Sequence, residues 1–184
     1  MQAETVIETG GPAWRRWLQG LFNAVAAVGT IWIFAIMMLI VADVVGRNFL
    51  GSPITGVAEI AARSVVAIVF LMLPAAVLGS TLIRADFLLR LLQFRSPRAP
   101  HILDTVFAIV GAVLFALIAK AAWPDTLGAW RTSEFFGVRG VWTLPTLPFR
   151  LIVVFGAAAS ALAFAVTFLD GLKSIRNPKA NFDD

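Results

Sequence analysis

Two acid–arginine pairs stand at helical spacing in the first third of the sequence. Asp43 precedes Arg47 by four residues, and Glu59 precedes Arg63 by four. Residues four apart share a helix face, so each pair can form an ion pair. Charges inside a membrane are costly and mark functional sites, whereas long side chains at the headgroup level reach water. We expect the headgroup position for Asp43 and Lys120, and leave both readings open for Arg47, Glu59 and Arg63.

Catalytic and metal chemistry has few residues to use. The chain contains no cysteine and a single histidine, His101. This excludes a disulfide, a thiolate metal site and a haem held by two histidines within the chain. The run Gly46–Ser52 has the spacing of a phosphate-binding loop but lacks its lysine, and no nucleophile elbow or dinucleotide fingerprint occurs. We therefore expect no enzyme activity, no cofactor and no metal, and place His101 at the membrane interface.

The composition explains why so few polar groups are present. Of 184 residues, 59% are hydrophobic and 14% are charged, and the mean hydropathy is +0.86. A soluble domain carries roughly a quarter of charged residues. The net charge of +4 comes from basic residues scattered between apolar runs, so we expect no nucleic-acid partner. The composition predicts an integral membrane protein in contact with membrane lipids.

Four apolar runs are long enough to cross a bilayer, which takes about 20 helical residues. They cover about residues 18–42, 57–83, 102–123 and 144–169. The predicted fold class is an all-α integral membrane protein with four transmembrane helices. One membrane domain, 14–170, follows a polar tail, 1–13, and precedes a cytoplasmic tail, 171–184. The first run is uncharged from Trp17 to Ala42, too long for the core of a signal peptide, so we expect it to be retained.

The segment between the second and third runs has a different pattern. Apolar residues at helical spacing face polar ones on the other side: Phe87, Leu88, Leu91 and Leu92 against Asp86, Arg90 and Gln93. This pattern is typical of a short helix lying in the membrane plane. An extension of the second span into the cytoplasm is an equal alternative for residues 84–94.

The distribution of basic residues predicts the orientation. Cytoplasmic loops of membrane proteins are enriched in lysine and arginine. With the N-terminus inside, nine of the 15 basic residues lie on the inner side and six elsewhere. We therefore expect both termini in the cytoplasm.

The spans show little that could bind a transported solute. None has an acidic residue at its centre, and Pro74 is a single break with no counterpart, whereas carriers use central charges and paired broken helices. Small residues instead recur at four-residue spacing. They are Ala108, Ala112 and Ala116 in the third span, and Ala157, Ala161 and Ala165 beside Gly156 and Ser160 in the fourth. Small residues let helices approach closely in lipid, so the fourth span is predicted to pack against other helices.

The segment from Val44 to Pro53, followed by Glu59, resembles a known family. The family it resembles is that of the small membrane subunit of tripartite ATP-independent periplasmic (TRAP) transporters, the DctQ-like family. In that family an arginine and an aromatic residue end the first span, a turn with glycine and proline follows, and a glutamate opens the second span. The matching residues here are Arg47, Phe49, Gly51, Pro53 and Glu59.

Two further segments carry the resemblance, which covers about residues 15–170. Ile83 and Asp86 match an isoleucine-x-x-aspartate after the second span, although Leu82 stands where the family commonly has histidine. Pro145 and Pro148-Phe149 match the opening of the last span. Candidate structural or partner-interface residues are therefore Arg47, Glu59, Arg63, Asp86 and Pro148.

The resemblance implies a partnership that the residues themselves do not show. Such a subunit pairs with a large multi-span subunit that holds the substrate and sodium sites. A periplasmic substrate-binding protein delivers the solute, typically an organic acid. The resemblance thus implies a non-catalytic scaffold in the bacterial inner membrane. The alternatives from the residues alone are a self-contained homo-oligomeric carrier or channel, and a membrane-bound enzyme or redox anchor, for which ligands and nucleophiles are missing.

A last expectation concerns the short connection after the first span. A tight turn at Gly51–Pro53 would bring the ends of the first two spans together. We therefore predict an ion pair between Arg47 and Glu59 that pins these two helices at one end.

Overall fold

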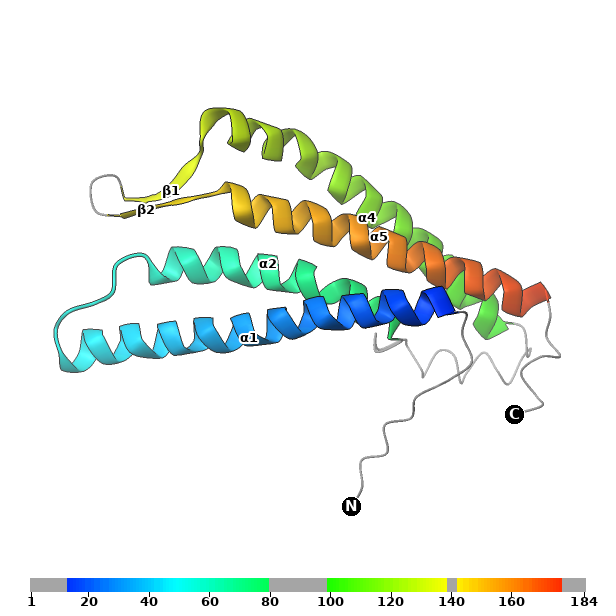
Figure 1. Ribbon diagram of the computed structural model, residues 1–184, viewed down its shortest axis with the longest axis horizontal. Coiled ribbons are helices and arrows are strands. Elements are labelled where there is room, and N and C mark those ends of the chain that lie inside the picture. The colour runs from blue at the N-terminus through cyan, green and yellow to red at the C-terminus, as the bar shows by residue number, and fades with distance from the viewer. Residues whose placement is uncertain (1–12, 80–98, 139–141, 177–184) are drawn as a thin grey trace, which may run out of the picture.

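The computed structural model describes residues 13–79, 99–138 and 142–176. Within these residues, four helices are long and apolar enough to cross a membrane. The predicted class, an all-α membrane protein with four spanning helices, is confirmed. Figure 1 shows two helical hairpins that lie together at one end of the molecule and diverge toward the other.

The first hairpin consists of α1 (Ala13–Phe49) and α2 (Val57–Leu78), which pack against each other. Its connection folds back onto the end of α1, where the amide of Ser52 donates to the carbonyl of Gly46 over 3.1 Å. Gly51 has a φ of +59°, a left-handed conformation that glycine adopts without strain. Helix α1 ends at Phe49, seven residues beyond the predicted end of the first span.

The second hairpin is built from α4 (Ala99–Thr132) and α5 (Leu147–Arg176). The third span is predicted to end near residue 123, but the helix is longer than this. The helix continues through Pro124 to Thr132, and Thr126 Oγ1 donates to the carbonyl of Ala122 over 2.8 Å. Threonine hydroxyls of this kind help satisfy the backbone around prolines in membrane helices.

A two-stranded antiparallel hairpin joins α4 to α5. Strand β1 (Phe135–Val138) pairs with β2 (Trp142–Pro145), with Phe135 opposite Pro145 and Val138 opposite Trp142. Gly137, with a φ of +119°, lies close to the backbone of Trp142. The sequence prediction contained no strands, because each of these has only four residues.

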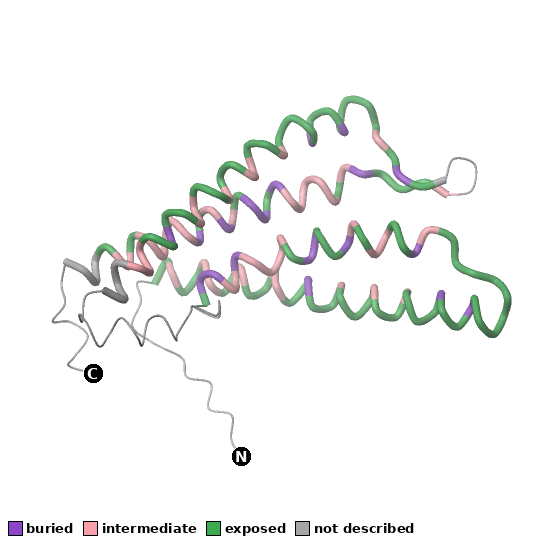
Figure 2. The backbone as a smooth tube through the Cα atoms, turned by 180° about the vertical axis from the view of Figure 1, so that it is seen from behind, coloured by how far each residue is buried: buried purple, intermediate pink, exposed green. Residues whose placement is uncertain are grey.

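Helix α5 occupies the centre of the bundle and packs against both α4 and α2. A Cβ added at Gly156 would lie 2.3 Å from the carbonyl oxygen of Phe70, so the backbones of α5 and α2 are in direct contact. Ala157, Ser160 and Ala163 are fully buried along the same helix. The predicted role of this span in helix packing is therefore confirmed, and Figure 2 shows its buried residues between those of its neighbours.

The two hairpins are joined at the end where α1 begins and α5 ends. Val77, Leu78 and Ala163 form a buried cluster there, against which Leu18 and Phe22 of α1 pack. Arg15 and Asp170 form an ion pair over 3.2 Å at the same end. The first and last described helical residues therefore lie on one side of the molecule, as an even number of crossings requires.

The chain ends differ in part from the prediction. Helix α5 continues to Arg176, so the tail predicted from residue 171 begins as helix. The interfacial helix predicted for 84–94, with its candidate residue Asp86, and the predicted end of the second span at residue 83 lie outside the described residues, as does the tail 1–12.

Candidate functional site

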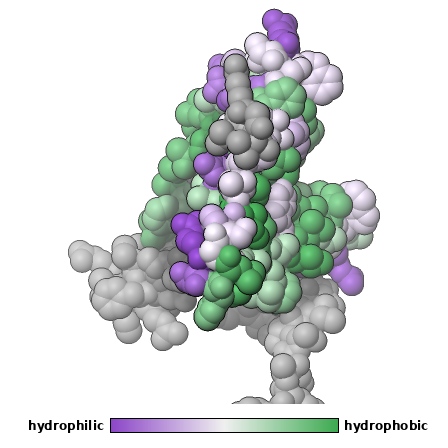
Figure 3. All heavy atoms as spheres, turned by 90° about the vertical axis from the view of Figure 1, so that its left-hand side faces the viewer, coloured by the Kyte–Doolittle hydropathy of each residue, from purple (hydrophilic) through white to green (hydrophobic). Residues whose placement is uncertain are grey.

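The polar side chains of interest gather at the end where the hairpins diverge. This end carries the α1–α2 connection and the β1–β2 hairpin, and Figure 3 views the molecule from that side. Hydrophilic residues lie there in separate patches among apolar surface. Four structural units lie at this end: an arginine clamp, a carboxylate brace, a cavity and an aromatic cluster.

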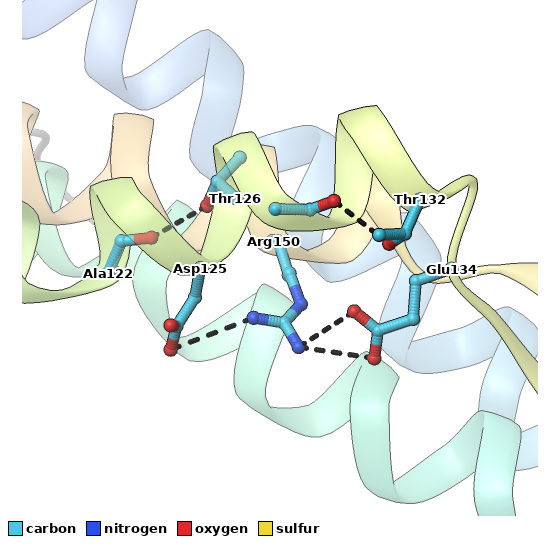
Figure 4. A network of polar contacts seen from close by, with 7 residues as sticks. Ala122, Asp125, Thr126, Thr132, Glu134 and Arg150 are labelled. Carbon is cyan, nitrogen blue, oxygen red and sulfur yellow. Dashed lines mark hydrogen bonds and ion pairs between the residues drawn. The ribbon is translucent and has the colours of Figure 1, made fainter.

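The arginine clamp joins the ends of α4 and α5 (Figure 4). Arg150 lies in the first turn of α5, and its Nη2 donates to both carboxylate oxygens of Glu134 over 3.2 and 3.1 Å. Its Nη1 lies 3.7 Å from the carboxylate of Asp125 on α4. The backbone adds a further link, because the amide of Thr146 donates to the carbonyl of Glu134 over 2.9 Å. One guanidinium thus fixes two segments of the α4–β1 junction to α5.

The carboxylate brace closes the α1–α2 connection. Asp43 is 8% exposed, and its Oδ2 accepts a hydrogen bond from Arg47 over 3.0 Å. Its Oδ1 accepts from the backbone amide of Ile54 over 2.8 Å. The predicted four-residue pair Asp43–Arg47 is therefore formed, and Asp43 carries a second role as the acceptor that holds the connection against α1.

A cavity of about 570 Å³ lies between α2, α4 and α5. Four charged residues line it: Glu59 and Arg63 from α2, Asp125 from α4 and Arg150 from α5. The remaining lining is apolar apart from Thr126 and consists of Ala62, Val66, Ala122, Phe149 and Val153. The cavity therefore has a charged part and an apolar part.

An aromatic cluster connects the β hairpin to the helices. The ring of Phe136 makes edge contacts with Trp142 and Phe149, with centroids 5.8 and 5.6 Å apart. The guanidinium of Arg63 lies 4.2 Å from the centre of the Phe136 ring, a cation–π distance. Gly56 lies directly under the Trp142 ring, and any Cβ there would collide with it. The hairpin is thereby attached to the start of α2.

The candidate residues from the sequence fall into two places. Arg47 and Glu59 both line a recess of about 340 Å³ beside the α1–α2 connection. No ion pair joins them among the described residues, so the predicted bridge is wrong, because Arg47 is paired with Asp43 instead. Glu59 and Arg63 are not paired either, since Arg63 turns onto Phe136. Pro148 is the second residue of α5, directly before the aromatic cluster and the clamp.

The sequence analysis missed the clamp. Neither Arg150 nor Glu134 was among its candidate residues. The single signal in the sequence was an arginine at the start of a long apolar run, between Pro148 and Leu151. Such a residue needs a partner close to the membrane edge.

The carboxylate side chains of the described helices lie near helix ends. In residues 13–79, 99–138 and 142–176, no group of three potential metal ligands occurs. The carboxylates of the four helices all lie within seven residues of a helix end: Asp43, Glu59, Asp104, Asp125 and Asp170. Each charged unit ties one segment to the next.

The comparisons with known proteins gave one match. A family model described as "Tripartite ATP-independent periplasmic transporters, DctQ component" matches residues 36–174, about three quarters of the chain. No curated protein and no solved structure matches the chain. The matched segment contains the brace, the clamp, the cavity and the β hairpin.

Proposed function

The chain belongs to the family of DctQ components of tripartite ATP-independent periplasmic transporters, and we propose that it is a non-catalytic scaffold bracing the large membrane subunit of such a transporter. As a family member it is the small permease subunit of a TRAP transporter and a multi-pass membrane protein. The large subunit, a periplasmic substrate-binding protein, an organic-acid solute and a bacterial inner-membrane location belong to the proposal. So do the roles of Arg47, Glu59, Arg63, Asp86 and Pro148 in structure or partner contact.

The observation that carries the proposal is the placement of charge and packing in the bundle. The middle of each described helix lacks carboxylates, whereas transporters bind ions and substrates near the midplane. The outer helices α1 and α4 are covered by exposed apolar side chains along most of their length, such as Ile31, Phe34 and Phe107. A bundle with a broad apolar outer face fits a supporting role better than a solute pathway.

Reconstitution tests this function directly. The chain, its proposed large partner subunit, and both together are placed in separate proteoliposomes, each with the proposed substrate-binding protein outside. We expect uptake only where both membrane subunits are present, and co-purification of the two from detergent. Uptake by the chain alone would contradict the scaffold function and support the alternative, a small homo-oligomeric carrier or channel.

A further inference from the structure

The cavity between α2, α4 and α5 lies near the ends of three helices that are long enough to cross a membrane. Its lining residues on α2 are in the first three turns of that helix, and those on α5 are in the first two turns. Its volume of about 570 Å³ falls in the range of about 300–1,000 Å³ typical of small-molecule pockets. The cavity is therefore large enough for a small polar ligand at this depth.

The lining of the cavity comes from three helices, two of which diverge toward this end of the bundle. Helices α2 and α4 pack on different flanks of α5 and diverge toward this end (Figures 1 and 2). Val66 and Val153 lie one to two turns further along their helices than Glu59 and Arg150, toward the middle of the bundle. The lining thus changes from charged to apolar in the direction of the membrane interior, as the surface of a phospholipid does.

The charged side chains of the cavity differ in whether they have an ion-pair partner. Arg150 is neutralised by Glu134, and its contact with Asp125 is longer than its contacts with Glu134. The Asp125 side chain is 75% exposed and has carboxylate capacity left. Glu59 has no ion pair or hydrogen bond among the described residues, and Arg63 has only its ring contact with Phe136. The cavity therefore presents two acceptor carboxylates and one guanidinium without a carboxylate partner.

We propose that this cavity binds the headgroup of an aminophospholipid of the phosphatidylethanolamine type. The ammonium group would lie between the carboxylates of Glu59 and Asp125 and donate its N–H groups to them. The phosphate would accept from the guanidinium of Arg63, which matches phosphate geometry well. The acyl chains would leave along the apolar lining between α2 and α4.

The charge pattern selects this headgroup over the other common ones. Phosphatidylglycerol carries the phosphate and hydroxyl donors but no cation, so its headgroup cannot neutralise the two carboxylates. Phosphatidylcholine has a cation without N–H donors, which cannot hydrogen-bond to carboxylates. A basic side chain of a partner protein would satisfy the carboxylates but would leave Arg63 without a phosphate.

Native mass spectrometry of the full chain with defined lipids tests the proposal. We expect phosphatidylethanolamine to be retained about tenfold more strongly than phosphatidylcholine or phosphatidylglycerol of the same acyl chains, which corresponds to about 1.4 kcal/mol. Glu59→Gln should reduce the preference for phosphatidylethanolamine, because an amide is a weaker acceptor without charge. Arg63→Gln should weaken the retention of all three lipids, because each carries a phosphate.

Matched variants and a cross-link decide the result. Arg131→Gln removes an exposed arginine near the end of α4, away from the cavity lining, and should leave lipid retention unchanged. A phosphatidylethanolamine with a photoreactive headgroup should label peptides that contain residues 59–66 and 122–126. Equal retention of phosphatidylethanolamine and phosphatidylcholine by the wild-type chain, an unchanged preference in Glu59→Gln, or labelling elsewhere would each overturn the proposal. Loss of the label when the large subunit is bound, with its own residues cross-linked at Glu59 instead, would assign the cavity to that protein and overturn it too.

Discussion

Two side chains, Asp43 and Arg150, determine how the connecting segments attach to the helices at one end of the bundle. Asp43 accepts a hydrogen bond from the backbone amide of Ile54, 11 residues further along the chain. Arg150 donates to the carboxylate of Glu134, which lies 16 residues earlier. Their contribution is to hold loops in one conformation.

The clamp can be tested by a double-mutant cycle on Arg150 and Glu134. Arg150→Met and Glu134→Gln should each lower the free energy of unfolding, with a coupling of about 0.2–1 kcal/mol, because both side chains are partly exposed. The measurement is reversible unfolding in mixed micelles. Arg131→Met, which removes an arginine next to the same junction, serves as the control and should have no effect. Additive single changes would show that the ion pair does not couple the two segments.

Two variants of Asp43 separate the ion pair of the brace from its hydrogen bond to the Ile54 amide. Asp43→Asn keeps an oxygen acceptor for the Ile54 amide and loses the ion pair with Arg47, whereas Asp43→Ala loses both. We expect Ala to be the more damaging change, because it also removes the acceptor of the Ile54 amide, and a hydrogen bond typically contributes about 0.5–1.5 kcal/mol. Unfolding of both variants under the same conditions gives the comparison. If Asn is as damaging as Ala, the ion pair with Arg47 dominates and the loop bond is unimportant.

At the level of elements, α5 organises the molecule. It contacts α2 and α4 along its small residues, its first turn carries the clamp, and its far end pairs with α1 through Asp170. The closest approach is at Gly156, where helix backbones touch. Small residues allow such approaches in membranes, where van der Waals packing replaces the hydrophobic effect between helices.

Adding one methyl group at this contact should separate the helices. Gly156→Ala places a Cβ against the Phe70 backbone, and overpacking of this kind costs about 1–3 kcal/mol. The control is Gly128→Ala in α4, where a Cβ meets nothing within 4 Å. That change should be neutral or stabilising by roughly 0.5–1 kcal/mol, because alanine is the better helix former. Unfolding free energies of the two variants measure the difference, and equal effects would show that the α2–α5 contact tolerates widening.

At the level of the whole molecule, charged and aromatic groups at one end hold two hairpins that diverge from a common packed base (Figure 1). The first described residues of α1 and the last of α5 lie at that base. A bundle of this shape has a wide apolar outer surface on α1 and α4. This surface is what the proposed large subunit, or lipid, would cover.

The orientation of this bundle in the membrane is a prediction from the nine-to-six distribution of basic residues. Alkaline phosphatase fused after residues 50 and 135 should be active, because it would be exported. Phosphatase fusions after residues 96 and 184 should be inactive. A reporter that works only in the cytoplasm should be active at the same two positions. An active phosphatase after residue 96 or 184 would overturn the orientation with both termini inside.

The local sequence by itself determined the number of spans, through its apolar runs, and indicated the family, through its motifs. An uninterrupted apolar run of about 20 residues has one stable environment, so four such runs specify four membrane helices whatever their arrangement. The motif around Arg47, Pro53 and Glu59 lies within the segment matched to the DctQ family. The pairing of Asp43 with Arg47 was also readable, because four-residue spacing fixes it within one helix.

Only the tertiary structure decided which charges meet across elements. The small residues of the fourth span predicted helix packing but not its partners, so the sequence could not show that α5 is central or that Gly156 touches Phe70. The continuation of α4 through Pro124 and the fold of the β hairpin bring Glu134 to Arg150, 16 residues apart. The same geometry left Glu59 away from its predicted partner Arg47, and placed it with Arg63 and Asp125 around one cavity. Such contacts depend on the positions of three helices at once, which no local spacing specifies.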